Sequence, residues 1–225
     1  MKEGIIVVNK PDGLTSHDVV MQVRRKFGLK RVGHAGTLDP MATGVLIVLL
    51  GKATKLFQEF VSFDKAYRAT LILGTKTDSS DTQGKIIEQN SFEHISRDDM
   101  EEVFDKFKGE IEQVPPMVSA VKVNGKKLYQ FARKGIEVER KARKVIIKKL
   151  EILGFNSPHV EFYLECSKGT YVRQIADDVG RVLGCGACIS QIERTQVGEF
   201  NIGEAVSLKD LNESHIRNWQ GPSTF

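Results

Sequence analysis

Apolar stretches of strand length recur along the chain and predict a fold rich in β-structure. Residues 45–50 are aliphatic or β-branched without interruption, and this pattern predicts a strand buried on both faces. Asn124-Gly125 is a strong turn signal of the hairpin type. Other apolar or alternating stretches predict strands at residues 5–9, 65–73, 118–123, 136–138, 143–155, 160–166 and 187–192.

Segments with helical periodicity lie between these strands. Thr15 or Ser16 begins a helix whose apolar positions fall on one face, and Gly28 ends it. Strands and helices do not alternate regularly, so we predict an α+β fold with a mixed, largely antiparallel sheet and flanking helices. Further helices are predicted at residues 52–61, with Leu56, Phe57 and Phe60 inward, from Ser96 to Gly109, at 126–134, at 169–183 and from Ser207.

The segment 31–44 departs from these regular patterns. It contains three glycines together with His34, Asp39 and Pro40. Glycine permits backbone conformations closed to other residues, and Pro40 restricts Asp39 to extended conformations. We therefore expect a tight turn and no ordinary strand, with the Asp39 carboxylate held at the mouth of the strand 45–50. The alternative is structural: Asp39 as a helix N-cap, with Pro40 in the first turn.

Composition indicates a soluble globular protein. The chain has 225 residues, of which 40% are hydrophobic and 28% charged, enough for one large domain or two small ones. No stretch approaches the roughly 20 apolar residues that a membrane span needs, and no signal peptide precedes the first strand. An odd number of cysteines, three, favours a reducing compartment. We expect a cytoplasmic protein.

The net charge of +4 is unevenly distributed. Residues 122–149 carry eleven Lys or Arg against two acids, whereas residues 62–113 carry twelve acids against seven bases. A basic segment of this kind is typical of a surface that binds a polyanion such as RNA. The alternative is an ordinary solvated face.

The motif Gly33-His34-Ala35-Gly36-Thr37-Leu38-Asp39-Pro40 resembles the catalytic motif of the TruB family of tRNA pseudouridine synthases. Four other stretches agree with the family in order: Asn9-Lys10-Pro11, Lys65-Ala66-Tyr67, Val114-Pro115-Pro116 to Ala120, and Ser167 to Arg173. The resemblance covers about residues 4–205 and implies the pseudouridine synthase fold, a long bent sheet with a central active-site cleft.

The resemblance also implies the chemistry. Pseudouridine formation detaches uracil from the sugar at N1 and reattaches it through C5, so it needs no cofactor and no metal. Asp39 matches the catalytic aspartate, which acts as a nucleophile or as a base that takes a sugar proton. A carboxylate in a water-poor cleft stays ionised if a cation is close, and Arg173 is that cation by its motif. Tyr67 would stack on the flipped uracil and take part in removing the C5 proton. Without the resemblance, Arg173 would be a surface helix residue and Tyr67 a core tyrosine.

Other positions match family residues near the substrate. His34 would occupy the space left by the flipped base or contact nearby RNA, and Tyr171 and Ile192 would flank that base. Lys10 and Lys168 would contact phosphate or support the site. The basic segment matches the insertion, at about residues 115–145, that folds over the T-arm of tRNA. Its expected RNA contacts are Lys126, Lys127, Tyr129, Arg133 and Lys134.

The substrate that follows from the resemblance is uridine 55 in the T-loop of tRNA. We expect residues 1–225 to form a single catalytic domain without a C-terminal PUA-type domain, acting on tRNA as a monomer with no obligatory protein partner and no membrane. Two other functions stay open: a tRNA-folding chaperone using the same cleft, and a synthase that depends on a guide RNA. The Cys185–Cys188 pair, with only Cys166 to join it, is interpreted as buried cysteines rather than a metal or redox site.

Overall fold

The apolar run at residues 45–50 lies in β3 (Thr43–Leu50), one of the central strands of the first of two units. The computed structural model describes residues 3–119, 121–123, 125–132 and 134–219. Unit 1 contains residues 1–66 and 193–225, and unit 2 contains residues 67–192. Strands β4 (Lys65–Leu73) and β12 (Ala187–Val197) each begin in one unit and end in the other.

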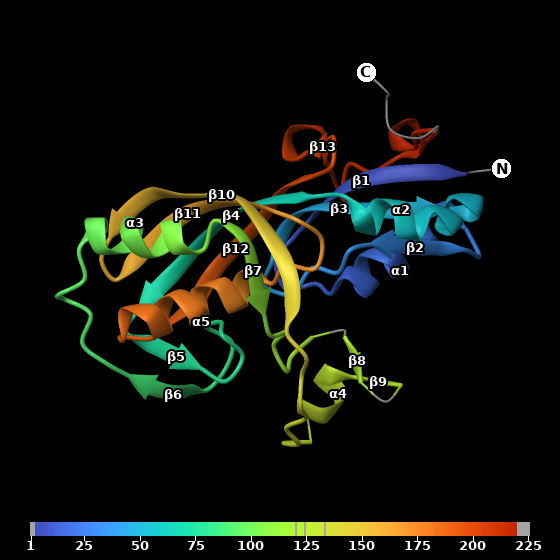
Figure 1. Ribbon diagram of the computed structural model, residues 1–225. Helices are drawn as coiled ribbons and strands as arrows, with labels where there is room; N and C mark the ends of the chain where they lie inside the picture. The colour runs from blue at the N-terminus through green and yellow to red at the C-terminus, as the bar shows by residue number, and fades with distance from the viewer. Residues whose placement is uncertain (1–2, 120, 124, 133, 220–225) are drawn as a thin grey trace. The chain divides into compact units, whose positions relative to one another are not determined.

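Unit 1 is built on the strand order β14-β1-β3-β12 (Figure 1). β1 (Gly4–Lys10) and β2 (Val32–Ala35) both pair antiparallel with β3, whereas β12 pairs with it in parallel at Thr43 and Gly44. The unit also contains α1 (Ser16–Phe27), the 3-10 helix η1 (Gly51–Leu56), α2 (Phe57–Ser62), β13 (Phe200–Asn201), η2 (Ile202–Glu204), β14 (Val206–Ser207) and η3 (Glu213–His215).

The core of unit 1 explains why β3 is apolar throughout. Val45, Ile47 and Leu49 belong to a cluster with Phe60 of α2 and Phe200 of β13. The alternate residues of β3 point to the other face and are equally buried, so both faces of the strand are covered as predicted. The amphipathic stripe of α1 is confirmed too, with a capping box at its start and Gly28 in the left-handed conformation at its end.

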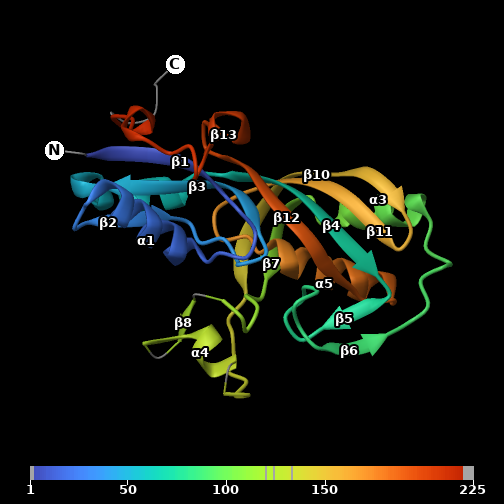
Figure 2. The ribbon, with the colours of Figure 1, turned by 180° about the vertical axis from the view of Figure 1, so that it is seen from behind.

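Unit 2 follows the strand order β12-β4-β11-β10-β7. A long antiparallel pair dominates it: β10 (Arg143–Asn156) and β11 (His159–Cys166). α3 (Arg97–Lys106) packs against α5 (Val172–Leu183) and β10 (Figures 1 and 2). The smaller elements are β5 (Thr75–Thr77), β6 (Ile86–Gln89), β7 (Gly109–Gln113), β8 (Lys122–Val123), β9 (Lys126–Lys127) and α4 (Leu128–Ala132).

The α+β class is confirmed, as is the mixed sheet, but several local predictions are wrong. Residues 32–35 form an ordinary strand, because Gly33 is extended and pairs with Leu49. Phe57 lies outward with 41% of its surface exposed, since a 3-10 turn precedes α2 and shifts its phase. Residues 136–138 form no strand, α5 begins at Val172, and a short strand and turn stand where a helix was predicted from Ser207.

Candidate functional site

Asp39 occupies the first position of a tight turn that leads into β3. The Ala42 N–H donates to the Asp39 carbonyl oxygen at 3.1 Å, and Pro40 and Met41 are the central residues. In a type I turn, Asp is favoured at the first position and Pro at the second, which are the positions of Asp39 and Pro40. No helix follows, so the alternative in which Asp39 caps a helix is wrong. Asp39 is half-buried and lies in the turn that directly precedes β3.

Two side chains from the start of the chain hold this turn. The Ser16 Oγ accepts from the Leu38 N–H at 2.9 Å and donates to the Leu38 carbonyl at 3.1 Å, so it fixes the residue before Asp39. The Lys10 Nζ donates to the Pro40 carbonyl at 3.0 Å, which fixes the residue after it. The Gly13 N–H donates to the same Pro40 oxygen at 3.0 Å.

Lys10 is fully buried. This burial bears on its two predicted roles, contact with phosphate and support of the site. Its ammonium also donates to the Pro11 and Leu14 carbonyls at 2.9 and 2.6 Å, so all three donors of the group meet backbone oxygens. A side chain with 0% exposure presents no surface to a phosphate, and its three bonds brace the backbone around the Asp39 turn. Burial lowers the pKa of Lys10 to about 8, while the nearby Asp12 and Asp39 carboxylates favour its charged form.

A third side chain contacts the same segment from β12. Arg194 is 1% exposed, and its Nε donates to the Val45 carbonyl at 2.7 Å. Its Nη2 donates to the Gly36 carbonyl at 3.0 Å. The Asp39 turn is thus bounded on both sides by bonds to one guanidinium. Sequence analysis missed both Arg194 and Ser16, because neither lies in a motif that marks it as functional.

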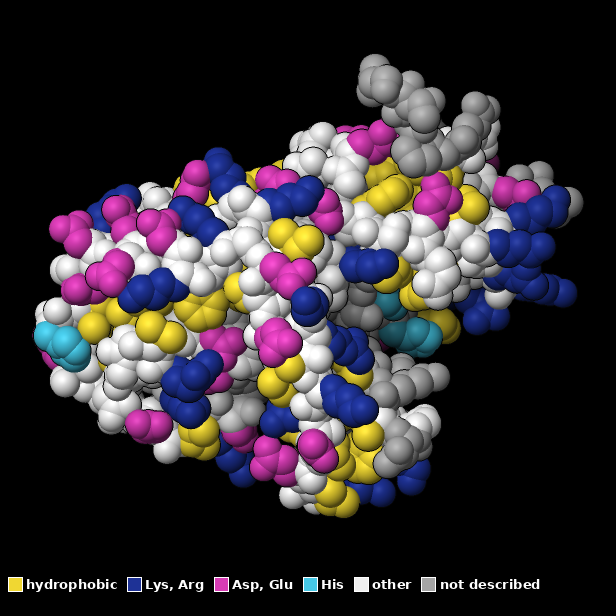
Figure 3. Space-filling view, viewed as in Figure 1, with side chains coloured by type: hydrophobic (Ala, Val, Ile, Leu, Met, Phe, Trp, Pro, Cys, Tyr) yellow, Lys and Arg dark blue, Asp and Glu magenta, His cyan; other side chains and the backbone are white. Residues whose placement is uncertain are grey.

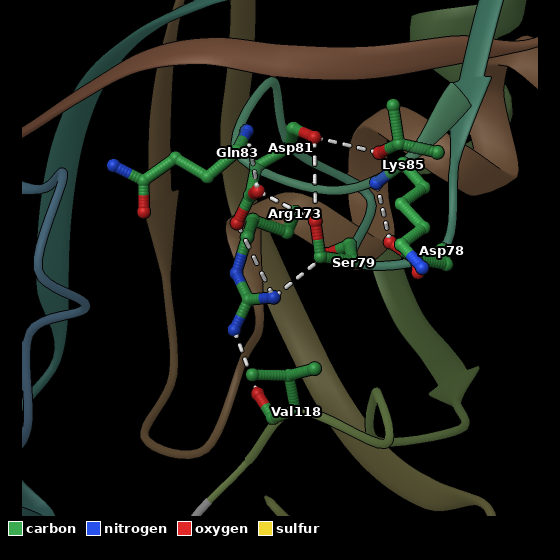
Figure 4. Close-up of polar contacts among 8 residues, drawn as sticks. Asp78, Ser79, Asp81, Gln83, Lys85, Val118 and Arg173 are labelled. Atoms are coloured by element: carbon green, nitrogen blue, oxygen red, sulfur yellow. Dashed lines mark hydrogen bonds and ion pairs between the residues drawn. The ribbon is translucent and has the colours of Figure 1, made fainter. Parts of the chain in front are cut away.

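In unit 2, Arg173 lies in the first turn of α5 and is 2% exposed (Figure 4). Its Nη1 donates to the Ser79 carbonyl at 2.7 Å, and its Nη2 donates to the Val118 carbonyl at 2.8 Å. The Asp81 carboxylate lies 3.6 Å from Nη1 and forms a buried ion pair with it. Arg173 is therefore a buried, multiply bonded cation and not the surface helix residue of the alternative interpretation.

The loop at residues 78–85, which supplies the Ser79 and Asp81 contacts, is held together by its own hydrogen bonds. The Asp81 Oδ1 accepts from the Ser79 Oγ at 2.6 Å and from the Gln83 N–H at 3.1 Å (Figure 4). Asp81 also forms a parallel bridge with Ile189 of β12, within unit 2. Asp81 is a further residue that sequence analysis did not assign, because an acid in a Ser-rich loop gives no signal of a partner ninety residues away.

The remaining predicted substrate residues divide between the units. His34, on β2 opposite Val48, is half-buried in unit 1 with Lys10 and Asp39. Tyr67 of β4 and Ile192 of β12 are buried in unit 2, where Lys168 is exposed just before α5. The pairing of Arg173 with Asp39 joins residues of different units and stays a prediction.

Tyr171 connects the start of α5 to the root of the predicted insertion. Its N–H donates to the Gln113 Oε1 at 2.8 Å, and the Gln113 Nε2 donates to its carbonyl at 3.1 Å. Gln113, the last residue of β7, pairs in register with Arg143, the first residue of β10. The chain therefore leaves the sheet after Gln113 and returns to it at the paired position Arg143, and the residues between them, 114–142, are called the insertion.

The described part of the insertion carries a short hairpin and α4. Lys122 pairs with Lys127 and Val123 with Lys126, around the predicted turn, although Asn124 itself lies outside the described residues. Lys126 and Lys134 are exposed, and within the described residues neither has a carboxylate at ion-pair distance. Arg133 lies outside the described residues, and the side chains of Lys127 and Tyr129 are not among those described.

The other half of the basic segment is largely compensated. Lys144 pairs with Glu110 at 2.8 Å, Lys149 with Glu151 at 2.9 Å, and Arg140 with Glu137 at 3.1 Å. Basic and acidic side chains accordingly intermingle over the face that carries β10 (Figure 3). The lysines of β10 are thus paired with acids, whereas Lys126 and Lys134 of the insertion are exposed.

Cys166, Cys185 and Cys188 are all buried, as predicted, and none of these three described residues is in a disulfide. Burial raises the pKa of Cys185, and it raises that of Cys188 to about 11. Among the described helices none has the length and apolar character needed to cross a membrane.

Comparison with known proteins decides the family. The model of the TruB family pseudouridylate synthase N-terminal domain matches residues 24–172, which include Asp39, Tyr67 and Tyr171. This chain belongs to the TruB family. A model of the tRNA pseudouridylate synthase B C-terminal domain matches residues 173–221, where Arg173 and Arg194 lie.

Curated TruB relatives match over most of the chain. The tRNA pseudouridine synthase B of Clostridium tetani is 46% identical over 220 residues, which are 98% of this chain and 76% of the relative. That of Endomicrobium trichonymphae is 46% identical over 94% of this chain and 92% of its own length.

Among solved structures, a chain in a crystal structure of a Cbf5-Nop10-Gar1 complex aligns with a TM-score of 0.74 and 32% identity. The alignment covers 93% of this chain and 54% of that one. The pseudouridine synthase fold expected from the sequence is thereby confirmed.

Proposed function

We propose that this chain is a tRNA pseudouridine synthase that isomerises uridine 55 in the T-loop of tRNA. The observation that carries the proposal is the Asp39 turn, because its carboxylate matches the family's catalytic aspartate and its backbone is held by three buried side chains. Ser16, Lys10 and Arg194 bond to carbonyl or amide groups at Gly36, Leu38, Pro40 and Val45. A pre-positioned reactive group is what catalysis by orientation requires.

The reaction is balanced without any external group. The bond between C1′ of the ribose and N1 of uracil breaks, a bond between C1′ and C5 forms, C5 loses its proton and N1 gains one. Asp39 assists the detachment, either by attacking as a nucleophile or by taking a sugar proton. We propose that no metal or cofactor takes part.

The proposed base-binding residues come from both units. A uridine stacked within folded RNA has to be flipped out before chemistry, at a cost of about a few kcal/mol. Tyr67 would stack on the flipped base and assist removal of the C5 proton, with Tyr171 and Ile192 beside it. His34 would fill the space that the base leaves, and Arg173 would keep Asp39 ionised within the predicted central cleft.

RNA contacts are proposed for the insertion at residues 114–142 and for Lys168. Lys126 and Lys134 are exposed there, as polyanion contacts have to be. Lys127, Tyr129 and Arg133 are proposed beside them on the basis of the family match. We propose that the chain acts in the cytoplasm as a monomer on tRNA alone, as one catalytic domain with this insertion.

The test is tritium release from tRNA transcripts labelled at C5 of uridine, with the product mapped by position. The transcript and the purified chain are incubated with no other RNA or protein, and a transcript with cytidine at position 55 is the control. We expect stoichiometric release that depends on uridine 55. Release only after addition of a second RNA would favour the guide-dependent synthase. Binding and refolding of tRNA without any release would favour the chaperone.

A further inference from the structure

Arg194 contacts the segment before the Asp39 turn and the segment after it with one planar group. The two acceptors are the Gly36 carbonyl, three residues before Asp39, and the Val45 carbonyl, at the start of the buried part of β3. The donors are Nη2 and Nε of the same guanidinium, whose relative geometry is fixed. The spacing between the two ends of the turn is therefore set by a rigid fork.

The glycines of the motif make room for this arginine. Gly44 has a φ of +98°, and a Cβ there would lie 2.3 Å from the Arg194 carbonyl oxygen and 2.8 Å from its nitrogen. Gly36 has a φ of +91°, and a Cβ there would lie 3.5 Å from the Arg194 Nη1. Gly44 is also the register partner of Arg194 in the parallel pairing of β3 with β12. Of the three glycines that mark the motif, Gly44 thus lies against the backbone of Arg194, and Gly36 lies beside its guanidinium.

The electrostatic surroundings agree with a role at the site. Besides burial, which lowers the pKa of Lys10, the Asp39 carboxylate raises this pKa and the Arg194 guanidinium lowers it, so the charges of all three residues of unit 1 act on one another. A buried arginine bonded to backbone oxygens acts on geometry, and displacement of a catalytic group by about 1 Å costs roughly 100-fold in rate.

We propose that Arg194 is a positioning residue for the reaction, which sets the Asp39 turn through its bonds to Gly36 and Val45 and does not touch the substrate. This inference rests on the proposed function. It predicts an effect on the rate of the bound complex and little effect on tRNA affinity, which a residue needed only for RNA contact would not give.

A matched control comes from the same unit. Lys65 is also buried, and its Nζ donates to the Val61 carbonyl at 2.7 Å and to the Phe63 carbonyl, away from the Asp39 turn. Lys65→Met removes a buried cation and its bonds to the Val61 and Phe63 carbonyls, neither of which belongs to residues 36–45. It therefore measures what the loss of such a clamp costs the fold of unit 1 in general.

The experiment compares Arg194→Lys, Arg194→Gln and Lys65→Met with the unchanged chain in single-turnover pseudouridine formation and in filter binding of the same tRNA. Circular dichroism and thermal unfolding establish which variants fold. An ammonium gives a cation but no planar fork, and an amide gives no charge. We expect Arg194→Lys to lose about 100-fold and Arg194→Gln more, with Kd within about threefold of the unchanged chain. Lys65→Met should stay within about threefold in rate.

Rates for folded Arg194 variants within threefold of the unchanged chain would overturn the inference. Equal losses in Lys65→Met and Arg194→Lys would also overturn it, as would failure of both Arg194 variants to fold, because Arg194 would then serve the fold alone. Absence of product with the unchanged chain would instead count against the proposed function, so the two failures are distinct.

Discussion

Arg173 and Arg194 are both almost fully buried, yet they hold different kinds of structure. Arg194 bonds to the two ends of one turn within unit 1, at Gly36 and Val45. Arg173 bonds to two separate segments of unit 2, at Ser79 and Val118, and also forms an ion pair with Asp81.

The difference shows what each guanidinium contributes. Arg194 acts on the shape of the segment that carries the proposed catalytic carboxylate of Asp39, so its loss is expected to displace that group. Arg173 joins the loop at residues 78–85 to the root of the insertion, so its loss is expected to release two segments at once and to leave the Asp81 charge buried without its partner. The same residue type therefore predicts a geometric defect in one unit and an electrostatic defect in the other.

The largest effect is expected from the loss of the Asp39 carboxylate, the group that both arginines are proposed to serve. Asp39→Asn keeps nearly the same shape and a polar oxygen for the turn but loses the negative charge. We expect single-turnover pseudouridine formation to fall by at least about 1000-fold, while filter binding of tRNA is retained. Substantial turnover would show that Asp39 is not the catalytic carboxylate. Loss of both turnover and binding in a folded variant would assign Asp39 to RNA positioning.

Arg173→Lys tests the electrostatic role proposed for Arg173. A lysine ammonium has all its donors on one nitrogen, so it cannot reproduce the planar fork in which two separate nitrogens reach Ser79 and Val118. We expect a rate loss of about 100-fold and an acid limb of the pH–rate profile displaced to higher pH. Asp81→Asn is the companion variant, since it removes the charge of the partner alone. If Arg173→Lys has the rate and the pH profile of the unchanged chain, Arg173 does not hold Asp39 ionised.

The bonds of Lys10 near the Asp39 turn are expected to depend on pH. Its folded pKa of about 8 means that the ammonium loses its proton above that pH and with it one of three backbone bonds near the turn. We expect the rate to fall as the pH rises through about 8, and Lys10→Met to be about tenfold slower but flat over this range. An identical alkaline limb in Lys10→Met would assign the titration to another group.

The same titration has a consequence for stability. The folded pKa of Lys10 lies below the ordinary lysine pKa of 10.5 that applies to the unfolded chain, so between pH 8 and 10.5 the unfolded state binds more protons. The free energy of unfolding should therefore rise with pH across this window in the unchanged chain relative to Lys10→Met. Urea unfolding of the two proteins at pH 7 and pH 9.5 measures the difference.

A smaller effect is expected from the insertion. Lys126→Ala with Lys134→Ala removes two exposed cations, and each phosphate contact contributes about 0.7–0.9 to the slope of log affinity against log salt. We expect the slope to fall by roughly 1.5. The control is Lys144→Ala with Lys149→Ala, because these lysines are paired with Glu110 and Glu151 and should change the slope less. Equal slopes in both double variants would make the insertion a solvated face.

The smallest effect concerns the cysteines. Burial raises the pKa of the Cys188 thiol to about 11 and also raises that of Cys185, so few thiolates exist at pH 8. We expect maleimide to label the three thiols only after unfolding, and Cys185→Ser with Cys188→Ser to change the rate less than twofold. Rapid labelling of the native chain would contradict this.

Sequence reasoning succeeded where a local pattern determines the structure. The apolar run of β3, the capping boxes of α1 and α3 and the Asp39-Pro40 turn all depend on neighbouring residues, and they were predictable. Arg194 and Asp81 were not, because their roles depend on partners far away in the chain. Gly33 shows a different error. Its place beside Gly36 and Gly44 suggested that it too needed a special backbone conformation, yet it lies in a regular strand.

The division of unit 1 between both ends of the chain sets an order of events during protein synthesis. A ribosome that has translated the first 192 residues has already synthesised all of unit 2, together with the segment of unit 1 that contains Lys10, Ser16 and Asp39. Arg194, β13 and β14 are translated afterwards, at about 5–20 residues per second. The segment that carries Asp39 is therefore synthesised before the arginine that we propose positions it.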